Sequence, residues 1–213
     1  MMKTLLPLLA LAALGAFASS ALAEDVAVIQ FKAGAQMQRV VLEFYENSAP
    51  ITVANFKKLA ASGFYNGTAV HRIFPHLMVQ MGDPLSKKKG SPGIGTGGPG
   101  YTLPPEIARK QTEGAVAAAR LSDKINPARR SNGSQFFVSL QPMPNLDGQY
   151  TVFAHVTEGL EALEQISQKS ADTNDSPVER VVIDSVRIQP REEATATVAS
   201  GENWFVRTFH RLF

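Results

Sequence analysis

The sequence predicts a mainly β domain, a mostly antiparallel barrel or sandwich, that carries only two helices. Many short runs of Val, Ile, Leu and Phe are separated by turn residues, and only two segments have the apolar period of an amphipathic helix. With 213 residues and no cysteine, the chain is long enough for one such domain to fold without disulfides.

The expected strands are the short apolar runs between turn residues. In chain order they are 26–31, 39–45, 69–73, 78–81, 115–119, 135–140, 151–156 and 178–188. The first helix is expected from Ser48-Ala49-Pro50, where a capping hydroxyl precedes a proline in the first turn, to Gly63. The second is expected over Gly159–Lys169. Two amphipathic helices are suited to closing the ends of a barrel.

The first 23 residues have the features of a secretory signal peptide. Lys3 precedes an apolar run over Leu5–Ala18, and Ala21-Leu22-Ala23 is a small-residue cleavage site. The run is shorter than the roughly 20 residues of a membrane-spanning helix, which disfavours an anchor. A short signal of this kind is typical of bacteria, and the absence of cysteine suits an oxidising compartment. We therefore expect a periplasmic chain that starts at Glu24.

The sequence argues against two other functions. The formal net charge is +2, which gives no support for nucleic-acid binding. The Gly/Pro-rich segment 87–100 contains a formal Gly-x-Gly-x-x-Gly pattern, but Pro99 interrupts it and 101–105 cannot open the helix that holds a pyrophosphate. We interpret this segment as a structural loop.

The domain is expected to span 24–190, with a change of composition after Pro190. Residues 191–202 are small and polar and are predicted to be a linker. Residues 203–213 have the pattern of a short amphipathic helix, with Arg207 and Arg211 on its polar side. Three interpretations stay open for this tail: weak contact with a membrane surface or a partner, packing on the domain, or disorder.

Four blocks of sequence carry the chemistry. They are Phe64–Pro84, Gly97–Tyr101, Asn132–Val138 and Leu146–Phe153. In this order the blocks resemble the cyclophilin family of peptidyl-prolyl cis/trans isomerases, in its exported bacterial form, over roughly Val26–Ile188. The resemblance implies an eight-stranded antiparallel closed barrel capped by two α-helices, with a substrate groove on its outer surface. It implies no cofactor and no metal, and we expect a monomer.

The reaction explains why these residue types are needed. Rotation about an X-Pro bond crosses a barrier of about 20 kcal/mol because the amide nitrogen donates its electron pair into the carbonyl. In the twisted transition state that pair returns to the prolyl nitrogen. A donor directed at this nitrogen therefore binds the twisted state better than either planar isomer. Arg72 is the predicted donor, because a guanidinium is always protonated and presents a planar fork of N–H groups.

The resemblance also implies the remaining roles. Gln80 joins Arg72 as a catalytic residue and orients Arg72 or the substrate backbone. The proline pocket is lined by Leu77, Met78, Phe137, Leu146 and Tyr150, whereas Gln135 and the main chain at Arg120 bind the peptide backbone, and Ala118 and Ala119 border the next subsite. Alternation along the strand predicts that Phe136 points inward and Phe137 outward.

Several positions depart from the usual family pattern. Leu77 and Val70 stand where phenylalanine is usual, Arg120 stands where asparagine is common, and Asn145 stands where drug-sensitive members have tryptophan. The segment 121–131 is longer and more basic than in compact members. We expect either a solvated loop or a wider contact with client chains.

Two functional interpretations follow. The first is an isomerase that assists the folding of exported or unfolded proteins with proline-containing segments. The alternative is a cyclophilin-like binding module, a chaperone or assembly partner in which catalysis is incidental. The intact set Arg72, Gln80, Gln135 and Phe137 favours the enzyme.

Overall fold

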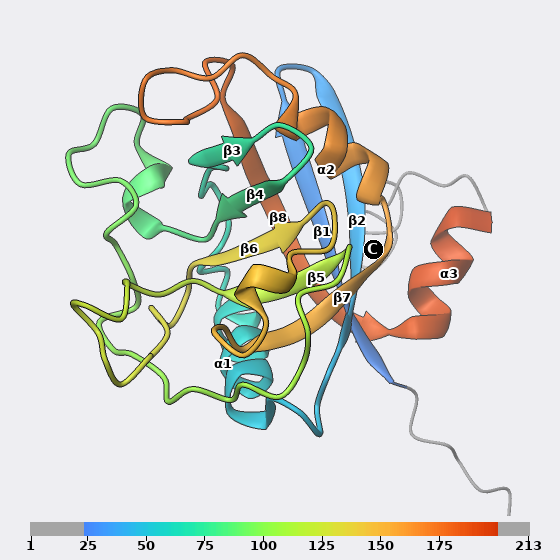
Figure 1. Cartoon of the computed structure of the whole chain (residues 1–213). Coiled ribbons are helices and arrows are strands. Elements are labelled where there is room, and N and C mark those ends of the chain that lie inside the picture. Colours follow the sequence, from blue (N-terminus) through green and yellow to red (C-terminus); the bar gives the residue numbers. More distant parts are fainter. Residues whose placement is uncertain (1–23, 200–213) are drawn as a thin grey trace, which may run out of the picture.

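The computed structural model describes residues 24–199 (Figure 1). The predicted signal peptide, 1–23, and the predicted amphipathic tail, 203–213, lie outside these residues. No helix in the described part of the chain is long and apolar enough to cross a membrane.

Eight antiparallel strands form one strongly curved sheet, with the order β3-β4-β6-β5-β7-β2-β1-β8. The strands are β1 (Asp25–Ala33), β2 (Gln36–Phe44), β3 (Arg72–Phe74), β4 (Met78–Met81), β5 (Ala115–Ala118), β6 (Phe136–Ser139), β7 (Val152–Glu158) and β8 (Val181–Pro190). Every strand overlaps a predicted run, and the prediction of a mainly β, antiparallel domain is confirmed. The starts of β2, β3 and β8 each differ by three residues from the predicted runs; β3, for example, begins at Arg72 instead of Ala69.

The predicted closure of the barrel is wrong. The sheet is open, because its edge strands β3 and β8 do not form a ladder with each other. Residues just before β3 approach β8 instead: Ala69 forms a single antiparallel bridge with Val182, and the Val70 N–H donates to the Val181 carbonyl at 3.0 Å. Strand β3 is too short to continue this pairing. The seam, meaning the boundary between β3 and β8, is therefore held by only a few main-chain hydrogen bonds.

Helices α1 (Pro50–Ala61) and α2 (Leu160–Ser167) lie at opposite ends of the curved sheet (Figure 1). Two short 3₁₀ turns, η1 (Pro84–Lys87) and η2 (Pro144–Leu146), lie in the connections. The predicted Ser48 cap of α1 is wrong, since the residue before the helix is Ala49 and no side chain caps from there. Glu106 caps the helix from a distant loop. Its carboxylate accepts from the N–H groups of Ile51 and Thr52, at 2.9 and 2.8 Å.

The predicted linker is also wrong over its described part. Residues Arg191–Ala199 form helix α3, which follows β8 directly. Ala194 is buried against Val26, Val28 and Val41 on the outer face of β1 and β2. The Arg39 guanidinium donates to the Ala194 carbonyl at 2.9 Å. Small, polar residues predicted a linker, but Ala194 and its tertiary contacts stabilise a helix.

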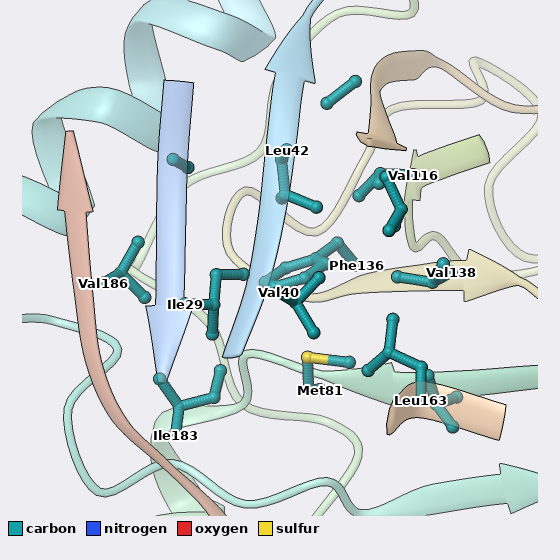
Figure 2. Packing of buried hydrophobic residues seen from close by; sticks show 14 of the residues in the cluster. Ile29, Val40, Leu42, Met81, Val116, Phe136, Val138, Leu163, Ile183 and Val186 are labelled. Carbon is teal, nitrogen blue, oxygen red and sulfur yellow. The ribbon is translucent and has the colours of Figure 1, made fainter. Parts of the chain in front are cut away.

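The main core fills the inside of the curved sheet. Figure 2 shows Ile29, Leu42, Phe136 and Ile183 converging there from different strands. Phe136 also packs edge-on against Phe56 of α1 at a ring-centre distance of 5.5 Å. Period-2 alternation supplies these inward side chains from each strand, so the opposite face of β4, β5 and β6 is left for a second, smaller cluster.

Candidate active site

A groove lies on the outer face of the short strands. It has a volume of about 250 Å³. Side chains from β3, β4, β6 and the connections around β5 and β7 line it: Arg72, Met78, Gln80, Ala119, Arg120, Phe137, Met143, Leu146 and Tyr150. The structure therefore brings eight of the predicted site residues to one place, and adds Met143.

Phe137 and Tyr150 form the aromatic part of this groove. Phe137 is 5% exposed, and its ring meets that of Tyr150 edge-on, with ring centres 5.3 Å apart. The neighbouring Phe136 points into the main core, as alternation predicted. Met78, Ala119 and Val152 belong to the same outer cluster as Phe137. The groove thus has an apolar floor of the size and kind that a proline ring needs.

Arg72 and Gln80 stand opposite each other in the β3–β4 ladder, so both side chains project from the same face. The Arg72 side chain is 47% exposed, and its guanidinium lies 4.5 Å from the centre of the Phe74 ring. An ion pair joins its Nε to the Asp175 carboxylate at 3.5 Å. Within residues 24–199, Gln80 makes no hydrogen bond to Arg72, in contrast to one of its two predicted roles.

Gln80 is held instead by Gln135. Its side-chain amide donates to Gln135 Oε1 at 3.0 Å, and the Gln135 amide donates to the carbonyls of Gly95 and Gly97 at 2.9 and 2.8 Å. Gln135 is 3% exposed and does not line the groove. Its predicted binding of the peptide backbone stays a prediction. It connects Gln80 to the Gly/Pro-rich loop.

Two other predicted residues lie away from the groove surface. Ala118 points into the main core, because Ala117 and Ala119 take the outward positions of this segment. The predicted place of Ala118 at the border of the next subsite stays a prediction. Leu77 packs against the outer cluster without lining the groove. Met143 was missed by sequence reasoning, since it lies outside the recognised motif blocks; it enters the groove from the connection before η2.

The Arg120 side chain is fixed at the rim. Only 4% of it is exposed, and it lies over the Tyr150 ring at 4.8 Å. Its Nε donates to the Gln149 carbonyl at 2.8 Å, and Nη1 pairs with Asp123 at 2.5 Å. Hydrogen bonds from Arg129 and Arg120 lower the pKa of Asp123. Arg120 therefore contributes a packed wall, in addition to the main-chain contact expected from the sequence.

His71 lies directly before Arg72 but is 7% exposed. Burial lowers the pKa of His71 below its ordinary value, which keeps the ring neutral near pH 7. In the described part of the chain, no group of three or more His, Cys, Asp or Glu side chains could hold a metal ion. The groove can therefore offer a proline ring an apolar floor, together with a cationic donor and an amide at its edge.

An apolar pocket beside a guanidinium, on the outer face of an eight-stranded curved sheet, fits the prolyl-isomerase site expected from the sequence. Residues 28–188 match the family model described as "Cyclophilin type peptidyl-prolyl cis-trans isomerase/CLD". The chain belongs to this family and is a cyclophilin-type peptidyl-prolyl cis-trans isomerase.

Curated relatives agree with this assignment. The chain is 42% identical over 132 residues to peptidyl-prolyl cis-trans isomerase B of Bacillus subtilis, with 61% of this chain and 83% of the relative covered. It is 36% identical over 159 residues to peptidyl-prolyl cis-trans isomerase-like 1 of Gibberella zeae, with 74% and 93% covered.

Solved structures have the same fold. A cyclophilin-type peptidyl-prolyl cis-trans isomerase of Cryptosporidium parvum matches with a TM-score of 0.68 and 26% identity, over 78% of this chain and 98% of that one. A second structure of that protein, in the presence of the dipeptide Ala-Pro, matches with a TM-score of 0.67 and 27% identity, over 78% and 99%.

Proposed function

We propose that this isomerase acts in the bacterial periplasm, where it accelerates X-Pro rotation in exported or unfolded polypeptides and so assists their folding. The observation that carries the proposal for the site is the position of Arg72, which lines an apolar groove and stands opposite Gln80. The pattern of residues 1–23 supports export.

The groove residues can bind the substrate at two places, the proline ring and the peptide backbone. Phe137, Met78 and Tyr150 offer apolar surface to the proline ring, which orients the bond without adding a charge near it. The substrate backbone then extends toward Gln80 and the rim at Arg120. When the ring is held, one side of the X-Pro bond is fixed, and the preceding carbonyl rotates about this bond in a substrate that is already positioned.

Arg72 supplies the interaction that distinguishes the transition state. Its N–H groups donate to the prolyl nitrogen only when the amide is twisted and the electron pair is localised there. A rate of about 10³ per second requires about 7 kcal/mol less than the uncatalysed barrier. One preorganised hydrogen-bond donor contributes about 2.7–4 kcal/mol where it has been removed from an oxyanion hole, and ring binding and orientation supply the rest.

The test of the site is a coupled-protease assay on an Ala-Pro-Phe peptide with residues 24–213. We expect Arg72→Ala to lower kcat/KM about 100-fold, because the donor is lost. We expect kcat/KM of Arg72→Lys to lie between those of the parent and Arg72→Ala, because an ammonium lacks the planar fork of N–H groups. The free energy of unfolding should change by less than about 0.5 kcal/mol, since Arg72 is half exposed.

Arg109→Ala is the matched control. Arg109 also lies over an aromatic ring, that of Tyr45, at 4.0 Å, but it does not line the groove. Its removal should leave kcat/KM within twofold of the parent. Full activity in Arg72→Ala would contradict the proposed role of Arg72.

The test of export is the N-terminus of the protein recovered from a bacterial host. We expect the mature chain to start at Glu24 and to be released with the periplasmic fraction by osmotic shock. A chain that keeps Met1 and stays with the cytoplasmic fraction would contradict the proposed location.

A second candidate function, client binding as a chaperone, is favoured by one observation. Leu121 and Ile125, on the long segment after β5, are 59% and 70% exposed. Large exposed apolar side chains beside a peptide groove are suited to unfolded chains. Light scattering of an aggregating client protein separates the two functions. If Arg72→Ala still protects the client from aggregation, and the double variant Leu121→Ser/Ile125→Ser does not, client binding is independent of the isomerase site.

A further inference from the structure

The connection between α2 and β8 reaches Arg72 through one residue. The Asp175 carboxylate lies 3.5 Å from Nε of Arg72. The main chain fixes the same residue, because the Ile73 N–H of β3 donates to the Asp175 carbonyl at 2.8 Å. Asp175 is therefore attached to the strand that carries Arg72 and also contacts the Arg72 side chain.

A tight turn presents this carboxylate. Asp172 Oδ1 accepts from the N–H groups of Asn174 and Ser176, at 2.8 and 3.0 Å. The Asp175 N–H donates to the Asp172 carbonyl at 3.1 Å. These bonds hold the backbone of Asp175 at a φ of 60°, in the left-handed region.

Glycine occupies the left-handed region at no steric cost, whereas a residue with a side chain is uncommon there. Asp and Asn are the side chains that tolerate it best. Strained backbone positions of this kind cluster at functional sites. At position 175 the contact of that side chain is with Arg72.

The contact leaves the donor end of Arg72 available. Asp175 faces Nε, and the Phe74 ring lies against the guanidinium. Among residues 24–199, no hydrogen bond occupies the two terminal nitrogens of Arg72. Asp175 itself does not line the groove, whereas Arg72 does. The carboxylate faces the Nε edge of the guanidinium and the ring lies against its face, so these two contacts limit the orientations open to it.

We propose that Asp175 is a positioning residue for catalysis, which holds Nε of Arg72 so that the terminal N–H groups are directed at the prolyl nitrogen. This proposal rests on the proposed role of Arg72 as the donor. Asp175 and Arg72 are 45% and 47% exposed, and pairs exposed to this degree contribute little to stability. The effect of Asp175 is therefore expected in the rate constant.

Asp175→Asn is the decisive variant, because Asn keeps the size of the side chain and tolerates the left-handed backbone. We expect kcat to fall about three- to fivefold and KM to stay within twofold, since the ring pocket is untouched. Glu179→Gln is the matched control. It removes a carboxylate of the same loop that pairs with Lys169 at 2.6 Å, and should leave kcat unchanged.

Salt gives a readout that a merely structural role would not move. Raising the ionic strength to about 1 M screens an exposed ion pair, so kcat of the parent should fall toward that of Asp175→Asn. The variant should respond little to salt. A variant with the parent's kcat, or with a higher one, would overturn the proposal.

The contact between Asp175 and Arg72 can also be tested by a measurement that does not involve catalysis. In NMR spectra, the Nε–H of Arg72 should exchange with water faster in Asp175→Asn than in the parent and in Glu179→Gln. An unchanged Nε–H would overturn the positioning contact. A changed Nε–H together with full activity of Arg72→Ala would instead reject Arg72 as the donor, so the failure of each idea is recognisable.

Discussion

The long and the short strands of the sheet differ in what they do. β1, β2 and β8 have nine, nine and ten residues and pair along nearly their whole length. β3, β4, β5 and β6 have only three or four residues each, yet their outer face carries the groove. Long ladders supply cooperative stability, whereas short strands let connections such as η2 and the Asp175 turn approach the groove from several sides.

This difference predicts which substitutions should change stability and which should change catalysis. Side chains on the inner face of the long strands are buried on all sides, so their loss creates a cavity. Arg72 and Gln80, the groove residues predicted to be catalytic, are exposed or partly exposed, so we expect the fold to depend little on them. Stability and catalysis should therefore respond to different residues.

The largest expected effect is on stability. Leu42→Ala in β2 removes a fully buried side chain from the core and should lower the free energy of unfolding by about 3 kcal/mol. Urea denaturation measures this change, and kcat/KM of the folded protein should stay within twofold of the parent. Met37→Ala, at a 42% exposed position of the same strand, is the control and should cost under about 0.5 kcal/mol. A large loss of kcat/KM in Leu42→Ala would contradict the idea that stability and catalysis depend on different residues.

An intermediate effect tests a connection between the two regions. Glu106 lies in the segment before β5 and caps α1, which packs against β7 and β8. Glu106→Ala should cost about 1–2 kcal/mol, because two N–H groups of the first turn lose their partner and a negative charge leaves the helix N-terminus. Thermal unfolding checks it. Ser48→Ala should change stability far less, and equal losses in both variants would argue for the cap predicted from the sequence.

The smallest effect concerns pH at the seam between β3 and β8. Burial holds the pKa of His71 below its ordinary value of 6.5, so the unfolded state binds a proton more readily than the native state. Stability is present above about pH 6.5 and is lost as the pH falls below it. Urea titrations between about pH 7.5 and 5 should show a smaller loss of stability in His71→Gln than in the parent. Identical pH profiles would contradict this account.

Period-2 patterns predicted the strands well, and β4 has the bounds read from the sequence. They also placed Phe136 and Phe137 on opposite faces. Alternation does not assign a face to Ala118, because its neighbours Ala117 and Ala119 have identical side chains and give no contrast between faces. Glu106 and Asp175 were missed because each acts on a residue far away in the chain, and no local pattern marks such a contact. The open seam depends on how few residues of β3 can pair, which composition does not reveal.

Helix α3 changes where the folding unit ends. Val26, Val28 and Val41 would form a bare apolar strip on the outside of the sheet without Ala194 above them. The family match stops at residue 188, so a chain shortened to that boundary keeps every groove residue but uncovers the strip. Such a strip on a β surface invites association between copies. For expression and crystallisation, the unit to be produced therefore extends through Ala199.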